Sequence, residues 1–327
     1  MVFLFKDKSI GSIIFLVILC GLVHIHLFLH PIASNMTEDN GLVSFGLRYC
    51  SSNILYSLVT PYLYLVIILI QAIRLNWLLN DLKMYNFSGF TAGLAYILLT
   101  AILPQWASLS AAVIGNSFVI WVFIFLSKLY GSPKPKETLF NTGLLVGVSF
   151  LCYHPTIILI PVALFALAVV RPFVLSEWFV LLLGIIAPIY LFASFVFLDD
   201  KMFLFFKTLP HFQLKMPINN SDVWLWVKVG SIFSMLLIGL QYWSLQNSRM
   251  VIQIRKNWGV MMVMLVIMLP IPFTFKNCGL DSAILWIVPL SSFIGNAYLY
   301  PKKAWLPNII FFVSVGLVVH TNWVLCK

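Results

Sequence analysis

Charged side chains are scarce in this sequence. Asp, Glu, Lys and Arg make up 9% of its 327 residues, 61% of the residues are hydrophobic, and the mean hydropathy is +1.00. Soluble domains carry roughly 25% charged residues because their surfaces face water. The shortage excludes a soluble domain and predicts that lipid surrounds most of the chain. The net charge of +10 comes from bases scattered through short joints, which does not indicate nucleic-acid binding.

Motifs for cofactors and redox chemistry are also absent. The sequence contains no Walker motif, GxGxxG or CxxCH. No carboxylate lies near the middle of an apolar segment, which disfavours a proton- or sodium-coupled carrier because such carriers need an ionisable group at depth. The five cysteines show no CxxC spacing, and we interpret them as buried apolar residues rather than disulfide partners or metal ligands. They are Cys20, Cys50, Cys152, Cys278 and Cys326.

Long apolar segments alternate with short polar joints along the whole chain. A helix needs about 20 apolar residues, sometimes about 17, to cross the hydrocarbon core. The pattern predicts an all-α fold, a single polytopic transmembrane bundle of about eleven spans. Two breaks contain proline, at residues 104–105 and 153–155, so the short segments beside them could instead form kinked or re-entrant pairs. The expected spans cover residues 9–29, 54–77, 90–103, 106–126, 139–152, 156–170, 177–198, 223–240, 259–275, 283–299 and 305–325.

The basic residues predict how the chain is oriented. With the N-terminus inside, the inner joints collect thirteen Lys and Arg residues and the outer joints six, and the positive-inside rule then favours a cytoplasmic N-terminus and a C-terminus on the opposite side. The inner set is Lys6, Lys8, Arg74, Lys83, Lys128, Lys134, Lys136, Arg171, Arg249, Arg255, Lys256, Lys302 and Lys303. The outer set is Arg48, Lys201, Lys207, Lys215, Lys276 and Lys327.

Six of the ten carboxylates fall on the outer side, so chemistry is expected there. The first outer segment, residues 30–53, contains Glu38 and Asp39, followed by apolar residues at helical spacing and by Arg48. This pattern predicts an acidic turn and then an amphipathic helix lying in the membrane interface. The apolar residues of that helix are Leu42, Phe45 and Tyr49.

The second outer segment, residues 199–222, combines paired carboxylates with bases. It carries Asp199 and Asp200, then an aromatic stretch with Lys207 and His211. Carboxylates can deprotonate an acceptor or hold a divalent cation, while a base neutralises a lipid-phosphate leaving group. Charges of this kind can equally be solvated loop residues, and both interpretations stay open.

Histidines and small residues offer weaker signals. His26 and His30 share a helical face, but no metal-binding motif surrounds them, so we favour hydrogen-bonded interfacial histidines over a metal site. His154, beside a proline at an outer turn, could act as a general base or donate a hydrogen bond to a lipid phosphate. Gly143 and Gly147 form a GxxxG motif, which favours close helix packing in lipid.

Residues 71–173 carry a family resemblance. The run QAIRLNWLLN…FTAGLAYILLTAILPQWASLSAAVIGNSFVIW…FNTGLLVGVSFLCYHPTIILIPVALFALAVVRPF is similar in rhythm to the membrane-embedded GT-C glycosyltransferases. The resemblance implies a first span, a long acidic outer loop, a juxtamembrane helix, and a module of seven spans. Residues 1–198 would be that module, 199–222 an outer loop, and 223–327 a variable set of four helices.

The same resemblance implies a function at the outer face. GT-C enzymes transfer a sugar from a polyprenyl-phosphate donor, and their catalytic acid lies in the first outer loop, which corresponds here to Glu38 or Asp39. The chain also resembles an uncharacterised inner-membrane family of Bacteroidota through the patterns at residues 76–80, 140–155 and 171–178. The alternatives are a nonenzymatic membrane subunit of envelope assembly or secretion, with protein partners, and a lipid flippase or transporter.

Overall fold

The computed structural model describes residues 2–7, 9–29, 40–51, 54–200, 213, 223–275 and 279–325. Every regular element in these residues is helical, which confirms the expected all-α class. The α-helices are α1 (Ile10–Val23), α2 (His26–Leu29), α3 (Leu42–Ser51), α4 (Ile54–Asp81), α5 (Thr91–Ile102), α6 (Ala111–Lys128), α7 (Pro135–Cys152), α8 (Leu159–Val170), α9 (Leu175–Leu198), α11 (Val223–Asn247), α12 (Ile252–Met268), α13 (Ile271–Thr274), α14 (Ile287–Leu299) and α15 (Trp305–Leu325). The 3-10 helices are η1 (Val2–Phe5), η2 (Pro104–Trp106), η3 (His154–Ile158) and η4 (Leu280–Trp286).

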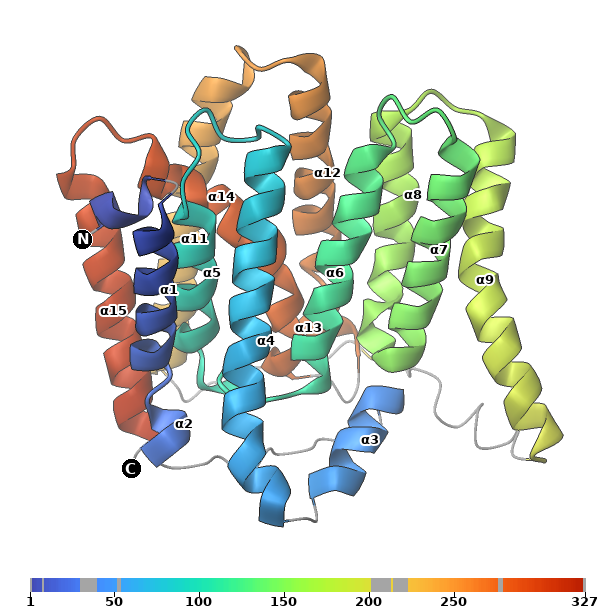
Figure 1. Cartoon of the computed structure of the whole chain (residues 1–327), viewed down its shortest axis with the longest axis horizontal. Coiled ribbons are helices and arrows are strands. Elements are labelled where there is room, and N and C mark those ends of the chain that lie inside the picture. The colour runs from blue at the N-terminus through green and yellow to red at the C-terminus, as the bar shows by residue number, and fades with distance from the viewer. Residues whose placement is uncertain are drawn as a thin grey trace.

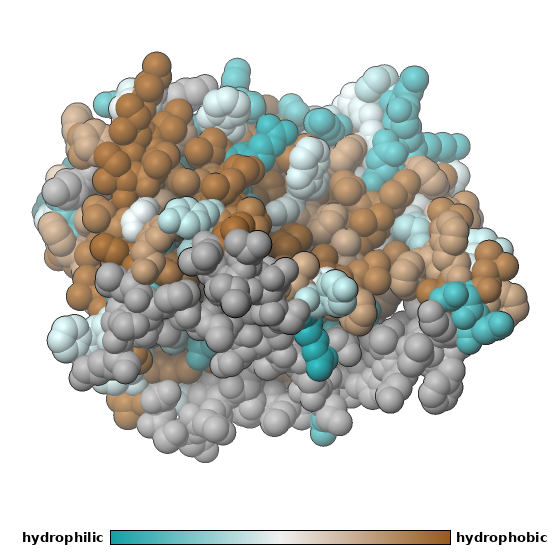
Figure 2. Space-filling model, turned by 60° about the horizontal axis from the view of Figure 1, so that its bottom comes forward, coloured by the Kyte–Doolittle hydropathy of each residue, from teal (hydrophilic) through white to brown (hydrophobic). Residues whose placement is uncertain are grey.

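Seven helices of the described residues are long and apolar enough to cross a membrane. Their lengths of 18 to 25 residues suit a hydrocarbon core of about 30 Å, and they fit a multi-pass integral membrane protein. Helices α1, α5 and the η3–α8 unit are apolar but shorter, so the expected count of eleven spans stays a prediction. Figure 2 shows a surface that is mostly hydrophobic along the helices, with hydrophilic side chains gathered toward its margins.

Helix α5 is the centre of the bundle. All of its residues from Thr91 to Ile102 are buried, and the helix packs against α1, α4, α14 and α15 (Figure 1). A helix that is hydrophobic on every side suits either lipid or the interior of a bundle, and α5 occupies the interior. At about 1.5 Å per residue its 12 residues span about 18 Å, and the irregular backbone that follows completes the path to the end of the bundle.

The N-terminal and C-terminal parts of the chain share one core. Every residue of α14 is buried, and this helix packs against both α5 and α11. The indole Nε1 of Trp258 donates to the carbonyl oxygen of Met84 at 3.1 Å, and Tyr85 Oη donates to the carbonyl oxygen of Ser292 at 2.7 Å. These bonds join the segment after residue 223 to the loop between α4 and α5.

The joints between helices meet at two opposite ends of the bundle (Figure 1). At one end, which we call the basic end, side chains of one joint bind carbonyls at the C-termini of other helices. Lys6 Nζ donates to Leu299 O at 3.2 Å, and Lys256 Nζ donates to Val170 O at 2.7 Å. Because a helix C-terminus carries partial negative charge, these cations stabilise the helix ends that they contact. Lys83, Lys134, Arg171 and Lys302 lie in joints at this end, and Lys128 is the last residue of α6.

Helices α7 and α9 approach each other through glycines. A Cβ on Gly143 would collide with the carbonyl oxygen of Leu181, and one on Gly147 with that of Ile185. From the other side, a Cβ on Gly184 would lie 2.5 Å from Phe140 O. This packing agrees with the helix contact expected from the GxxxG motif. The rest of α9 faces outward, since only 17% of its most apolar stretch is buried inside the protein.

Candidate functional site

The expected site residues that the structure describes lie at the end of the bundle opposite the basic end, which we call the acidic end. Four of the expected residues are outside the described residues: Glu38, Asp39, Lys207 and His211. The others, Arg48, His154, Asp199 and Asp200, are described, and the structure separates them into two places.

The turn between α7 and η3 holds His154 inside the protein. Pro155 disfavours helix in the residue before it, and Tyr153 accordingly ends α7 with extended backbone, φ −149° and ψ 108°. Proline then occupies the first turn of η3, where a missing N–H costs nothing. The turn leaves His154 8% exposed, with its ring packed against Phe150 at a centroid distance of 5.4 Å.

His154 is electrically neutral at pH 7. Burial lowers the pKa of its imidazole from 6.5 to about 4, because the charged form loses its hydration. Its ring nitrogens form no hydrogen bond with the described residues. A neutral imidazole in this state can accept a proton or donate a hydrogen bond to a ligand, although it does not attract a phosphate by charge.

The end of the first outer segment is anchored at this turn. The backbone N–H of His154 donates to the carbonyl oxygen of Asn40 at 2.9 Å. Gly41 has φ +123°, and a Cβ there would lie 2.6 Å from Cys152 O, so only glycine fits. Asn40 directly follows Asp39 in the sequence, and the anchor therefore brings the described end of the acidic segment to His154.

Helix α3 follows the anchor and is the amphipathic helix expected from the sequence. Leu42, Phe45 and Tyr49 are exposed along one face, whereas Val43 and Leu47 pack against the core. Exposed apolar side chains on a helix at the end of a membrane bundle suit the lipid interface. Arg48 lies on this helix and is exposed.

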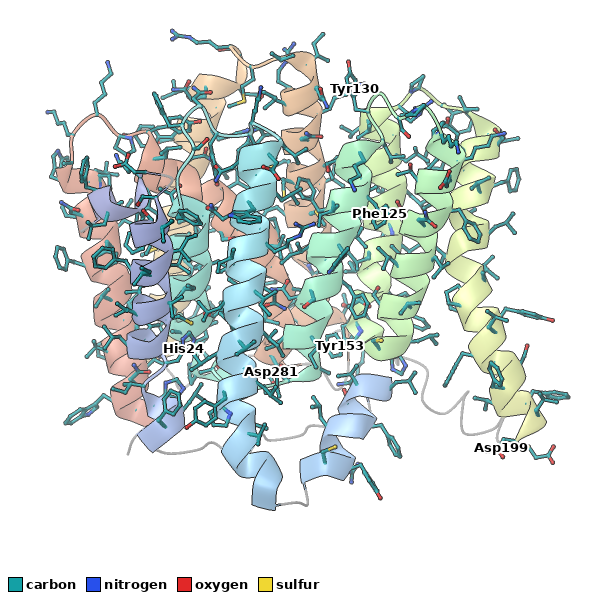
Figure 3. The ribbon with its side chains drawn as sticks, in the orientation of Figure 1. His24, Phe125, Tyr130, Tyr153, Asp199 and Asp281 are labelled. Carbon is teal, nitrogen blue, oxygen red and sulfur yellow. The ribbon has the colours of Figure 1, made fainter. Side chains whose placement is uncertain are left out.

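Asp199 and Asp200 are not brought to His154. They follow the last residue of α9, both are exposed, and Figure 3 shows Asp199 apart from Tyr153 and Asp281. Asp200 takes the left-handed backbone conformation with φ 53°, which aspartate tolerates at helix ends. Their exposure favours solvated helix-end charges over a paired catalytic site.

Asp281 is a carboxylate of the acidic end that the sequence interpretation did not select. It lies in the first turn of η4 and is half-buried. The indole of Trp106 donates to the carbonyl oxygen of the preceding residue, Leu280, at 2.9 Å. Its position could have pointed to Asp281 as a site residue, because this scarce carboxylate stands just before the apolar run 283–299.

A buried hydrogen-bond network lies beside this region, around His24. His24 Nδ1 is 3.1 Å from Cys20 O, and its Nε2 is 3.3 Å from Tyr64 Oη and 3.4 Å from Thr100 Oγ1. Tyr64 in turn donates to the carbonyl oxygen of Trp106 at 2.8 Å. These side chains satisfy polar backbone groups of the buried α5–α6 turn, which has no water to bond with.

His24 is thus hydrogen-bonded, whereas neither ring nitrogen of the buried His26, which was expected to be hydrogen-bonded, has a partner among the described residues. His26 lies next to His24, with a ring-centroid distance of 6.2 Å, while His30 is outside the described residues. Within the described ranges, no group of three or more His, Cys, Asp or Glu side chains could hold a metal ion.

Other buried charges serve the fold or lie away from His154. Arg171 and Glu177 form an ion pair of 3.0 Å at the basic end, which ties α9 to the turn before it. Lys228 in α11 is 4% exposed, so its ammonium group is enclosed by the bundle rather than extended into water.

The acidic end thus presents a neutral buried imidazole, a half-buried carboxylate and an interfacial helix at one membrane boundary. This set could bind a lipid headgroup, accept a proton and donate a hydrogen bond to an oxyanion. Comparisons with protein families, with curated proteins and with solved structures find nothing that matches this chain.

Proposed function

We propose that the chain crosses the membrane eleven times, with a cytoplasmic N-terminus and a periplasmic C-terminus in the inner membrane. Support comes from the alternation of the helices between two ends and from the separation of charge between those ends. Bases that remain on the cytoplasmic side would account for the basic end. The short helix α5 would cross with the help of the irregular backbone at residues 103–110, which includes η2.

We infer that the protein transfers a sugar from a polyprenyl-phosphate donor at the outer face, with the first seven spans arranged as in GT-C enzymes. The observation that carries this proposal is the anchor between Asn40 and His154, which joins the acidic segment to a buried, neutral imidazole at one membrane boundary. Such a place suits a reaction in which the donor lipid stays in the membrane while its sugar-phosphate linkage reaches the acidic end.

The proposal assigns roles to named residues. Glu38 or Asp39 would take the acceptor proton or hold a divalent cation, and His154 would donate a hydrogen bond to the donor phosphate. Arg48, Lys207 and His211 would neutralise the phosphate as it leaves. Asp199 and Asp200 would contact substrate only at the rim, since both are exposed.

A nonenzymatic membrane subunit is the second candidate, and the exposure of α9 favours it. That helix contacts the bundle mainly through α7 and leaves aromatic side chains exposed, including Phe179, Tyr190 and Phe195. A lipid flippase has less support, because polar side chains inside the bundle bond to one another. Tyr96 Oη, for example, donates to Gln71 Oε1 at 2.7 Å.

Substitution of the acidic pair tests the enzymatic proposal. Purified protein in nanodiscs would be given radiolabelled polyprenyl-phosphate monosaccharides, with membrane extract as the source of acceptor. We expect Asp39→Asn or Glu38→Gln to lower transfer by about 10²-fold or more, because a group that moves the proton or holds the cation in the transition state is lost. Asp7→Asn, at the basic end, is the matched control and should retain activity. Full transfer by the Glu38→Gln, Asp39→Asn double variant would contradict the proposed roles, and stable co-purification of a partner protein would then favour a subunit.

A further inference from the structure

One carboxylate at the acidic end is held partly inside the fold without a cation. Among the described residues, Asp281 has neither an ion pair nor a side-chain hydrogen bond. The other described carboxylates are exposed, apart from Glu177, which is buried but paired with Arg171. Withdrawing a carboxylate from water without a partner is unfavourable. Such a group is therefore a candidate for function rather than for stability.

The backbone on both sides of Asp281 is fixed. Trp106, itself 2% exposed, donates its indole N–H to Leu280 O, and Ser282 Oγ donates to Gly279 O at 2.9 Å. Leu280 and Ser282 are the immediate neighbours of Asp281. The carboxylate therefore projects from a rigid turn of η4, as a group that must meet a substrate in one geometry should.

Asp281 lies at the same end of the bundle as the turn that holds His154 (Figure 3). The side chains of Tyr153 and Leu285 both lie beside Gly115 of α6. A Cβ on this glycine would be 3.2 Å from Tyr153 Cδ1 and 3.5 Å from Leu285 Cδ2. Leu285 comes four residues after Asp281, which is about 8 Å along a 3-10 helix. Figure 3 shows Asp281 and Tyr153 together at this end of the bundle.

We propose that Asp281 is the proton acceptor for the acceptor hydroxyl in sugar transfer at the acidic end, which leaves cation binding as the role of Glu38 or Asp39. In this step the hydroxyl oxygen forms a bond to the anomeric carbon of the donor, and its proton passes to Asp281. The bond between the anomeric carbon and the phosphate oxygen breaks, and the polyprenyl phosphate leaves with the electron pair. No further reactant is needed. The inference rests on the proposed function and deepens it.

The surroundings of Asp281 suit this role better than those of the other described outer carboxylates. Asp199 and Asp200 are exposed at the end of α9, where water can solvate them. Among the described residues no cation pairs with Asp281, so both of its oxygens stay available as acceptors. His154, which is neutral, would complement it as a hydrogen-bond donor to the phosphate.

Activity and chemical labelling test the proposal together. With the polyprenyl-phosphate monosaccharide assay, we expect Asp281→Asn to lower turnover by about 10²-fold or more while KM changes little, since the amide keeps the shape but takes no proton. Asp281→Glu should retain part of the activity because it restores a carboxylate. Asp81→Asn, an exposed carboxylate at the basic end, is the matched control and should leave turnover unchanged. Monodisperse elution of each variant from a sizing column shows that it has folded.

Dicyclohexylcarbodiimide supplies a readout that does not depend on turnover. This apolar reagent modifies carboxyl groups in apolar surroundings, and peptide mass spectrometry locates the modified residue. We expect Asp281 to be modified faster than Asp199 or Asp200, and we expect added polyprenyl phosphate to slow the modification of Asp281 alone.

The outcomes separate this inference from the function on which it rests. A turnover loss in Asp281→Asn together with protection by polyprenyl phosphate supports both. Normal turnover in Asp281→Asn overturns the assignment of Asp281 and leaves sugar transfer standing. A wild-type protein that transfers no sugar from any donor overturns sugar transfer and the proton-accepting role with it. Modification of Asp281 that polyprenyl phosphate does not slow overturns the placement of Asp281 at the donor site.

Discussion

At the scale of single residues, burial decides which polar groups can act. His154 and Asp281 sit at the same end of the bundle, and both are withdrawn from water, whereas Asp199 and Asp200 are exposed. A side chain that has lost its hydration responds strongly to a ligand or a proton, while a solvated one does not. Chemistry is therefore expected at the Tyr153–His154 turn rather than at the end of α9.

The pH dependence of stability reports the burial of His154. The pKa of this imidazole is lowered from 6.5 to about 4, so between those values the folded protein binds fewer protons than the unfolded one. The free energy of unfolding should then fall as the pH drops from 6.5 toward 4 and should not change through His154 above 6.5. We expect the thermal midpoint in detergent to fall over that range and to fall less in His154→Gln. Equal slopes for the two proteins would show that the imidazole is hydrated.

At the scale of helices, close approach and irregular backbone explain how the elements are arranged. Helices α7 and α9 come together because Gly143, Gly147 and Gly184 leave space for the facing backbone. The buried turn between α5 and α6 persists because Tyr64 and Trp106 supply or accept the hydrogen bonds that water cannot. The α7–α9 glycine contact and the α5–α6 turn each hold helices that end at the acidic end.

Alanine substitution in the glycine contact should loosen α9. We expect Gly147→Ala to destabilise the protein by about 1–3 kcal/mol, since the new methyl group would collide with backbone and with Pro188. Gly21→Ala in α1 is the matched control, because no atom lies within 4 Å of a Cβ at that glycine. Thermal midpoints in one detergent compare the two variants. An unchanged midpoint for Gly147→Ala would mean that α9 moves away at little cost.

At the scale of the whole molecule, charge divides the bundle into two unlike ends. The basic joints bind the C-termini of neighbouring helices through Lys6 and Lys256, so their cations stabilise the fold and would also set its orientation. The acidic end carries the buried imidazole and Asp281, which pairs with no described cation. Under the proposed function, the basic end would anchor the fold and the acidic end would carry the chemistry.

Reaction of introduced cysteines in intact cells tests the proposed orientation. In a variant without the five native cysteines, an impermeant thiol reagent should modify Asp199→Cys from outside the inner membrane. The same reagent should modify Lys134→Cys only after the cells are opened. The opposite pattern would reverse the orientation and remove the acidic end from the periplasm.

Much of the fold could be predicted from local sequence. Hydropathy and proline breaks predict α3, the ends of α5 and the turn after α7 closely, because these features depend on neighbours along the chain. The sequence pattern places the start of one span at residue 259, but helix α12 begins at Ile252. The start of the helix carries Arg255 and Lys256, so it is too polar to be recognised as part of an apolar segment. Helices extend beyond the hydrocarbon core, and hydropathy detects only the part in lipid.

The candidate site was only partly predictable. The sequence alone determined that the chain is a multi-pass helical membrane protein and that its carboxylates gather on one set of joints, because hydropathy and charge act residue by residue. Only the tertiary structure decided that Asn40 meets His154 and that Trp106 binds the backbone beside Asp281, 174 residues away in the chain. Burial and hydrogen bonding between distant segments depend on how whole helices pack, and no local pattern records that packing.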